Sequence, residues 1–149
     1  MTFKIKVFKE CIRQLDHKIN ELKLALSDLT EGAENDSKSS AGDKHETSRA
    51  MMQLEQEKIN QQLNDALVQK VVLDQIDPEV NSSVVETGSL VKTDKGYLFI
   101  SAALGKVRVD DTDVITISIK SPLAQKLTGL KKGQAAEMNG TKYMLESVL

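Results

Sequence analysis

Two carboxylates are the residues best placed to do chemistry. Asp43 and Glu46 lie three residues apart in a polar stretch, where the second of two long helical patterns begins. We interpret the stretch as the end of a helical hairpin that carries both carboxylates to a site on another molecule. An Asp-x-x-Glu pattern at a helix start is also a capping box, which stabilises the helix by ~1 kcal/mol. The two interpretations do not exclude each other.

Cys11, His17 and His45 are the other residues that suggest catalysis. Cys11 falls inside a helical pattern, and neither a Gly-rich turn nor an oxyanion-hole motif accompanies it. We therefore expect a buried or half-buried helix thiol and exclude a thiol enzyme. His45 lies between the two carboxylates, and we expect a solvated residue there, with proton transfer as the alternative.

Composition narrows the class of protein. The chain has 149 residues, a net charge of −2, 3% aromatic residues and no Trp, so an aromatic-lined ligand pocket is not expected. The nearly neutral total argues against unaided binding to nucleic acid. No apolar run approaches the roughly 18 residues of a membrane span, and the start lacks a signal-peptide core. A single cysteine allows no internal disulfide, which fits the cytoplasm.

Residues 3–29 have the period of an amphipathic helix. Apolar side chains recur at alternating spacings of three and four, which is the a/d pattern of a seam between two helices. The seam positions are Ile5, Phe8, Ile12, Leu15, Ile19, Leu22, Leu26 and Leu29. The charged residues between them predict a solvated face.

A polar segment and a second helix follow. Residues 31–42 are rich in Gly, Ser, Asn and Asp without an apolar period, so we expect a loop, and residues 31–46 form a net negative tip. A helix is predicted over 43–75. Its apolar stripe is Met52, Ile59, Ala66 and Leu73, widened by Leu54, Leu63, Leu67 and Val71 and interrupted by Gln56 and Lys70. Two such helices joined by a loop form an antiparallel coiled coil.

The period changes to two after Asp77-Pro78. Strands are predicted within 84–91, 96–101, 114–119 and 142–149, with turn signals at Asp94-Lys95-Gly96 and Asn139-Gly140 and a short helix over 121–129. Helices grouped before strands predict an α+β chain. We expect a coiled-coil hairpin over 1–77, a linker over 78–83 and a β domain over 84–149.

Two segments resemble Gre-type bacterial transcript cleavage factors, which act on RNA polymerase. A-G-D-K-H-E at 41–46 is similar to the tip motif G-D-x-x-E of that family. I-S-I-K-S-P-L-A-Q-K-L-T-G-L-K-K-G-Q at 117–134, followed by N-G-T-K-Y-M-L-E-S-V-L, resembles the signature and closing hairpin of its C-terminal domain. The resemblance implies a coiled-coil hairpin and an FKBP-like antiparallel β domain with one short helix.

The resemblance also implies a mechanism. The hairpin of such factors enters the secondary channel of RNA polymerase, where the polymerase hydrolyses backtracked RNA. Asp43 is implied as a ligand of a shared Mg²⁺ and Glu46 as the residue that orients a water. The partners are then RNA polymerase and the RNA 3′ end within the complex, without a membrane or independent sequence-specific DNA binding. The chain has no cofactor of its own and is not itself an enzyme, and Ser121, Pro122 and Leu123 are implied surface contacts.

The tip departs from the family pattern. Residues 45–50 read H-E-T-S-R-A where the family usually has S-E-N-A-E-Y, so Arg49 and Ala50 replace an acid and an aromatic residue. Some relatives occupy the same channel and inhibit, and a channel-binding inhibitor without cleavage activity stays open. A coiled-coil adaptor for other proteins is the alternative from a different class. Prolyl isomerase activity is not expected, because Tyr97, Phe99 and Tyr143 are too few to line a pocket.

Overall fold

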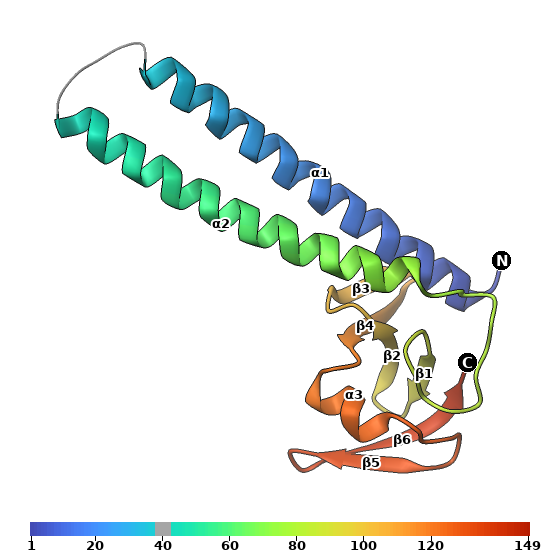
Figure 1. Ribbon diagram of the computed structural model, residues 1–149. Helices are drawn as coiled ribbons and strands as arrows, with labels where there is room; N and C mark the ends of the chain where they lie inside the picture. Colours follow the sequence, from blue (N-terminus) through green and yellow to red (C-terminus); the bar gives the residue numbers. More distant parts are fainter. Residues whose placement is uncertain (38–42) are drawn as a thin grey trace. The chain divides into compact units, whose positions relative to one another are not determined.

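The computed structural model describes the backbone of residues 1–37 and 43–149 and the side chains of residues 1–32 and 46–149. Within these residues, two long helices precede a six-stranded sheet with one short helix (Figure 1). This order confirms the predicted α+β class. The elements are α1 (Phe3–Ser37), α2 (Asp43–Asp74), β1 (Leu90–Thr93), β2 (Gly96–Ser101), β3 (Gly105–Val109), β4 (Thr112–Ser118), α3 (Pro122–Leu127), β5 (Ala135–Met138) and β6 (Thr141–Val148).

Helix α1 is longer than its apolar period indicates. We expected a loop from residue 31 onward, and this was wrong for residues 31–37, which are helical. Glu31, Ala33 and Glu34 are good helix formers, and one glycine in a helix costs only ~1 kcal/mol. The helix can therefore continue past the last apolar seam position at Leu29. Helix α2 begins at Asp43, as predicted, and ends one residue before the predicted end.

The seam forms at a/d positions of both helices. Between residues 15 and 68 the buried apolar side chains are those of Leu15, Ile19, Ile59 and Ala66. Leu22, Leu26, Leu29, Met52 and Leu63 are half-buried at the remaining apolar seam positions, and so is Gln56. The predicted widening was wrong at three positions, because the side chains of Leu54, Leu67 and Val71 are 65%, 42% and 56% exposed. Two helices alone bury only a narrow stripe of each other.

The first turns of α1 bury a different stripe from the predicted one. Val7 and Cys11 are fully buried there, whereas Ile5, Phe8 and Ile12 are only half-buried. The start of α1 contacts the sheet region as well: the Phe3 ring centroid lies 5.1 Å from that of Tyr97, and Nζ of Lys6 lies 2.8 Å from a carboxylate oxygen of Asp110. Because the start of α1 contacts the sheet region as well as α2, a different side of the helix is buried there.

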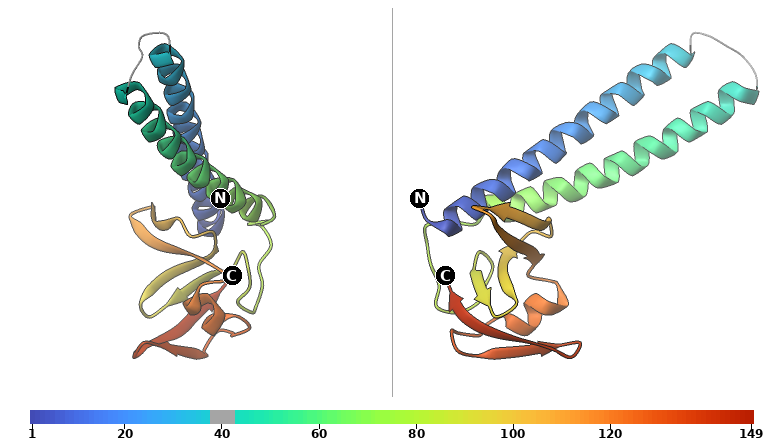
Figure 2. Two further views of the ribbon diagram at one scale, coloured as in Figure 1. Left: turned by 60° about the vertical axis from the view of Figure 1, so that its left-hand side comes forward. Right: turned by 180° about the vertical axis from the view of Figure 1, so that it is seen from behind.

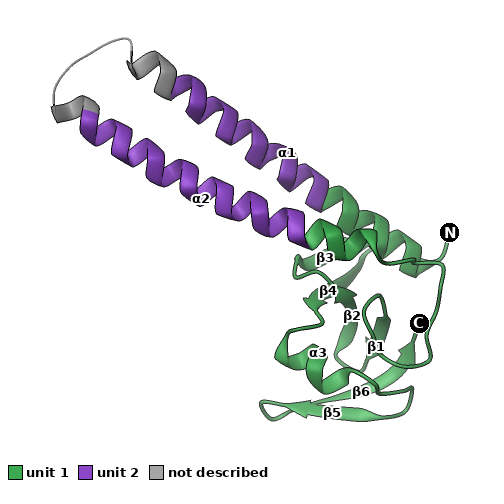
Figure 3. Ribbon diagram, in the orientation of Figure 1, with its two compact units in different colours: residues 1–14, 69–149 green, residues 15–68 purple. Residues whose placement is uncertain are grey.

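The chain divides into two compact units (Figure 3). The first combines Met1–Gln14 with Gln69–Leu149, and so joins both helix ends to the β domain. The second is Leu15–Val68. The predicted division into 1–77, 78–83 and 84–149 separates helices from strands, whereas the two units are defined by compactness. The predicted division therefore stays a prediction.

The sheet has the strand order β3-β4-β2-β1-β6-β5 (Figure 2). Neighbouring strands are antiparallel except β2 and β4, which run parallel because β3 intervenes between them in the chain, so the expectation of a purely antiparallel domain needs this correction. Helix α3 packs on one face of the sheet, and the core there consists of Val85, Val91, Leu98, Ile100, Ala124, Leu127 and Leu145. Strands β3 and β5 were not predicted, since their sequences G-K-V-R-V and A-A-E-M contain few large apolar residues.

Turn residues determine the register of the hairpins. Asn139 and Gly140 both have positive φ, of 52° and 79°, which is the conformation that the Asn-Gly signal predicts. Asp94 joins the β1–β2 turn to β6, because its carboxylate accepts a hydrogen bond from the backbone N of Met144 at 2.8 Å. Lys95 and that backbone N–H both lower the pKa of the Asp94 carboxyl below its usual range.

Truncating the largest fully buried side chain of the sheet tests this packing. We expect Phe99→Ala to lower the free energy of unfolding by about 3–5 kcal/mol, because the ring is 0% exposed and its removal leaves a cavity. Leu54→Ala, at a 65% exposed position, is the control and should change it by no more than about 0.5 kcal/mol. Urea unfolding followed by circular dichroism measures both, and equal effects would contradict the assigned core.

Candidate functional site

The two predicted carboxylates lie at the start of helix α2. Asp43 is its first residue, but the side chain of Asp43 lies outside the described residues, and so does that of His45. Glu46 belongs to the first turn of the helix, and its side chain is exposed. Within the described part of the chain, no hydrogen bond or ion pair engages the Glu46 carboxylate.

The charges of the chain are unevenly distributed between its two units. Residues 15–68 contain eleven Asp or Glu and six Lys or Arg, a net charge of −5. Residues 1–14 and 69–149 contain eleven acids and fourteen bases, a net charge of +3. The unit that carries Glu46 therefore repels nucleic acid in isolation, because backbone phosphates are bound by a local excess of cations.

The described residues contain no cluster of three or more His, Cys, Asp or Glu side chains that could hold a metal ion. A single carboxylate on a solvated helix end is too weak a ligand for Mg²⁺, which is usually held by one or two carboxylates together with phosphate oxygens and water. Glu46 therefore needs ligands from another molecule to contribute to a metal site. Among the same residues, no helix is long and apolar enough to cross a membrane.

The predicted contact residues at the start of α3 have different environments. Ser121 is the N-cap of α3, and its Oγ accepts a hydrogen bond from the backbone N of Ala124 at 3.2 Å. Pro122 occupies the first turn and is exposed, while Leu123 is half-buried and packs against the core under α3. Pro122 is thus available to a partner. Ser121 and Leu123 also serve the fold, and their role as contacts stays a prediction.

Cys11 and His17 show no catalytic arrangement. Cys11 is 0% exposed, and burial, with a smaller effect of Glu10, raises the pKa of its thiol to about 12. His17 Nε2 lies 2.9 Å from a carboxylate oxygen of Glu21, one turn along the same exposed helix face. Neither residue has the neighbours of an activated nucleophile.

The basic residues near the start of α1 line a hollow of about 410 Å³ together with Arg108 of β3. Most of them are neutralised locally. Lys6 pairs with Asp110 at 2.8 Å, Arg13 with Glu10 at 2.6 Å, and Arg108 with Asp113 at 3.1 Å. This pairing fits the predicted solvated face.

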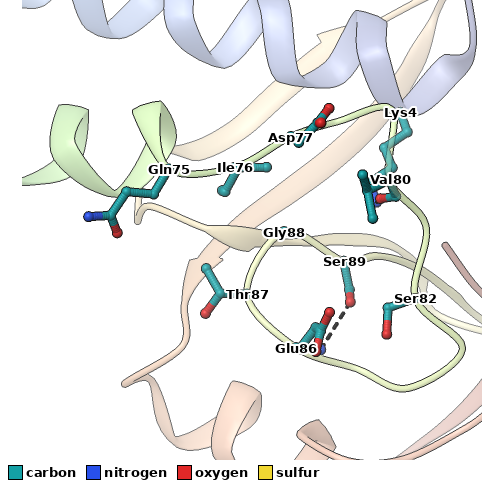
Figure 4. A pocket seen from close by; sticks show the side chains of 10 residues that line it. All are labelled: Lys4, Gln75, Ile76, Asp77, Val80, Ser82, Glu86, Thr87, Gly88 and Ser89. Atoms are coloured by element: carbon teal, nitrogen blue, oxygen red, sulfur yellow. Dashed lines mark hydrogen bonds between the residues drawn. The ribbon is translucent and has the colours of Figure 1, made fainter.

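Lys4 is a buried cation that sequence reasoning did not single out. Its side chain borders a cavity of about 370 Å³, in which Asp77, Glu86, Ser82 and Thr87 also lie (Figure 4). Lys4 is 4% exposed, and its Nζ donates a hydrogen bond to the backbone O of Val80 at 2.8 Å. Burial lowers the pKa of its ammonium, while the charges of Glu86 and Asp77 oppose that shift. The available signal was its place on the stripe of Val7, Cys11 and Leu15, because all four recur at helical spacing.

Comparisons with known proteins give little beyond this description. No protein-family model matches the chain, and no curated protein matches it. Among solved structures, one described as the transcription factor Gfh1 aligns over 95% of this chain and 92% of its own, with a TM-score of 0.34 and 16% sequence identity. A likeness of this degree carries no conclusion about function, so the proposal that follows rests on the residues of this chain.

Burial predicts that the Cys11 thiol is inert in the folded protein. With a pKa of about 12, roughly one thiol in ten thousand is ionised at pH 8, and the side chain has no access to reagent. We expect no reaction with Ellman's reagent until the protein is unfolded. A Cys11→Ala, Leu54→Cys variant is the positive control, because position 54 is exposed, and rapid reaction of the native wild-type thiol would contradict the burial.

The buried ammonium of Lys4 predicts a pH dependence of stability. Because its folded pKa is lowered, the unfolded chain binds more protons between that pKa and the ordinary value of 10.5, so stability rises with pH in this window. Lys4→Met removes this contribution, and the wild type should gain stability relative to the variant as the pH rises toward 10.5. Urea unfolding at several pH values measures the difference. Lys9→Met, at an exposed position on the same helix, should retain the wild-type slope.

Proposed function

We propose that this chain is a transcription elongation factor that binds RNA polymerase, inserts its helical hairpin into the secondary channel and stimulates cleavage of backtracked RNA by the polymerase. Asp43 and Glu46 are the residues that it contributes to the reaction. The chain supplies no complete active site of its own, and its only cofactor is the Mg²⁺ of the polymerase.

The observation that carries the proposal is an exposed carboxylate at the end of a long helix, without a partner among the residues that the structure describes. Helix α2 has 32 residues, so it is roughly 50 Å long at ~1.5 Å per residue. Glu46 lies in its first turn and makes no bond within the described residues. A carboxylate that serves neither the helix nor a neighbouring side chain is free to act on another molecule.

The chemistry suits these residue types. Asp43 would supply a hard oxygen ligand to a Mg²⁺ shared with the polymerase. That ion would stabilise the attacking and leaving oxygens of an in-line displacement. Glu46, one helical turn further, accepts a hydrogen bond from the attacking water and orients it, and it accepts the proton that the water loses.

The β domain supports the same proposal through the second resemblance. The segment 117–134 forms the end of β4, a Pro-initiated helix α3 capped by Ser121, and a glycine with positive φ at Gly129, after which β5 and β6 close the sheet. Ser121, Pro122 and Gly129 of the motif thus each have a local structural task. Exposed Pro122 is the position that we expect to contact the polymerase.

A channel-binding inhibitor is the second candidate. It is favoured by one observation: Arg49 is exposed on the turn of α2 that follows Glu46, where the resembled family usually carries an acid. A cation one helical turn from Glu46 competes with Mg²⁺ for the carboxylates and binds phosphate oxygens directly. Such a tip occupies the site without promoting hydrolysis.

A transcript cleavage assay on backtracked polymerase complexes tests the proposal. We expect the wild type to accelerate release of the 3′ RNA fragment, and Asp43→Ala and Glu46→Ala each to reduce the rate roughly a hundredfold while the affinity for polymerase changes little. Glu57→Ala, an exposed carboxylate further along the same helix, is the matched control and should behave as the wild type.

The remaining outcomes separate the alternatives. Binding of the wild type to polymerase without faster cleavage indicates the inhibitor, and in that case Arg49→Glu is the variant expected to gain activity. Absence of polymerase binding contradicts both candidates and leaves an adaptor for other proteins.

A further inference from the structure

The seam of the hairpin changes in character along the unit Leu15–Val68. The inner seam contains Leu15, Ile19, Ile59 and Ala66, all of them buried, together with half-buried Leu63. The outer seam consists of Leu29, Gly32, Met52 and Gln56, and every one of these is only half-buried. Gly32 lies against Met52, since a methyl group added at Gly32 would lie 3.3 Å from Cε of Met52. The outer seam therefore contains two half-buried apolar side chains, where the inner seam has four buried ones.

Both exceptional residues of the outer seam weaken it. Gly32 has no side chain to pack and, in a helix, gains more backbone freedom on opening than any other residue. Gln56 places a carboxamide at a seam position, and within the described residues that carboxamide makes no hydrogen bond. Leucine at the same position would bury apolar surface instead. Helices without a packed face are marginal in water below about 12–15 residues.

Electrostatic repulsion acts in the same direction. The helical residues 28–37 and 43–58 contain eight acids and three bases, a net charge of −5. Like charges gathered on neighbouring helices favour their separation, and no third element covers the described part of this segment.

We propose that the outer seam opens on its own in the free protein, while the inner seam stays paired, and that binding of the partner closes it. The partner is the polymerase of the proposed function, on which this part of the inference rests. Because only the closed hairpin binds, the apparent affinity is the affinity of the closed hairpin multiplied by the fraction of molecules in which the hairpin is closed. The weak outer seam thus lowers the fraction of the partner that is occupied by the hairpin.

Amide hydrogen exchange on the full chain tests the opening. After correction for intrinsic rates, we expect backbone amides at 27–32 and 48–56 to exchange at least roughly a hundredfold faster than those at 15–19 and 59–66. Equal protection of the two sets would overturn the inference, whether or not the protein binds polymerase. Addition of polymerase should bring the outer amides to the protection of the inner ones.

Two substitutions test the cause. Gly32→Ala and Gln56→Leu should each slow exchange of the outer amides roughly fivefold, because the flexible end of Met52 can yield to the new methyl group and leucine restores an apolar seam position. The double variant should bind polymerase more tightly than the wild type. Asn20→Ala, an equivalent gain in helix propensity at an exposed position beside the inner seam, should change neither. If Asn20→Ala slows the outer amides as much as Gly32→Ala does, opening is not governed by the outer seam and the inference fails.

Discussion

The stability of the hairpin depends on the hydrophobic contact between two helices along one stripe. In the unit Leu15–Val68 this stripe is the only source of burial among the described residues, and it reaches full burial at just a few a/d positions. The same two helices acquire more neighbours at their other ends, where Val7, Cys11 and Leu73 are fully buried. One helix thus has two environments, and its buried face follows whichever neighbour is present.

A protein built around such a seam has little room for an enclosed active site. The hollows beside Lys4 and near the start of α1 are lined by mixed charges, and the cysteine is buried. The proposed function instead uses groups at the surface that another molecule completes. Glu46 has the properties that this requires: exposure, a fixed place in the first turn of a helix, and no partner within the described residues. The net charge of −5 on the same unit disfavours unaided binding to RNA.

The β domain is organised by different forces. Its register depends on turns with positive φ, on Asp94 and on the Ser121 cap, and its core lies between the sheet and α3. The carboxylate of Asp94 and the hydroxyl of Ser121 each satisfy a backbone N–H that would otherwise lack a protein acceptor. These hydrogen bonds stabilise the β domain, which contains the segment that resembles the Gre signature, and Pro122 of that segment is exposed.

Local patterns in the sequence determined both helices, the Asn139-Gly140 turn, the capped helix α3 and the α+β class, because each depends on spacing or turn chemistry within a few residues. The sequence also identified Asp43 and Glu46 as the acids of interest. Only the tertiary structure decided that Lys4 is buried, that Leu54 is exposed and that β2 and β4 run parallel. Burial and strand direction depend on which distant segment lies alongside, and a helix with apolar residues on two faces does not reveal in advance which of them will be covered.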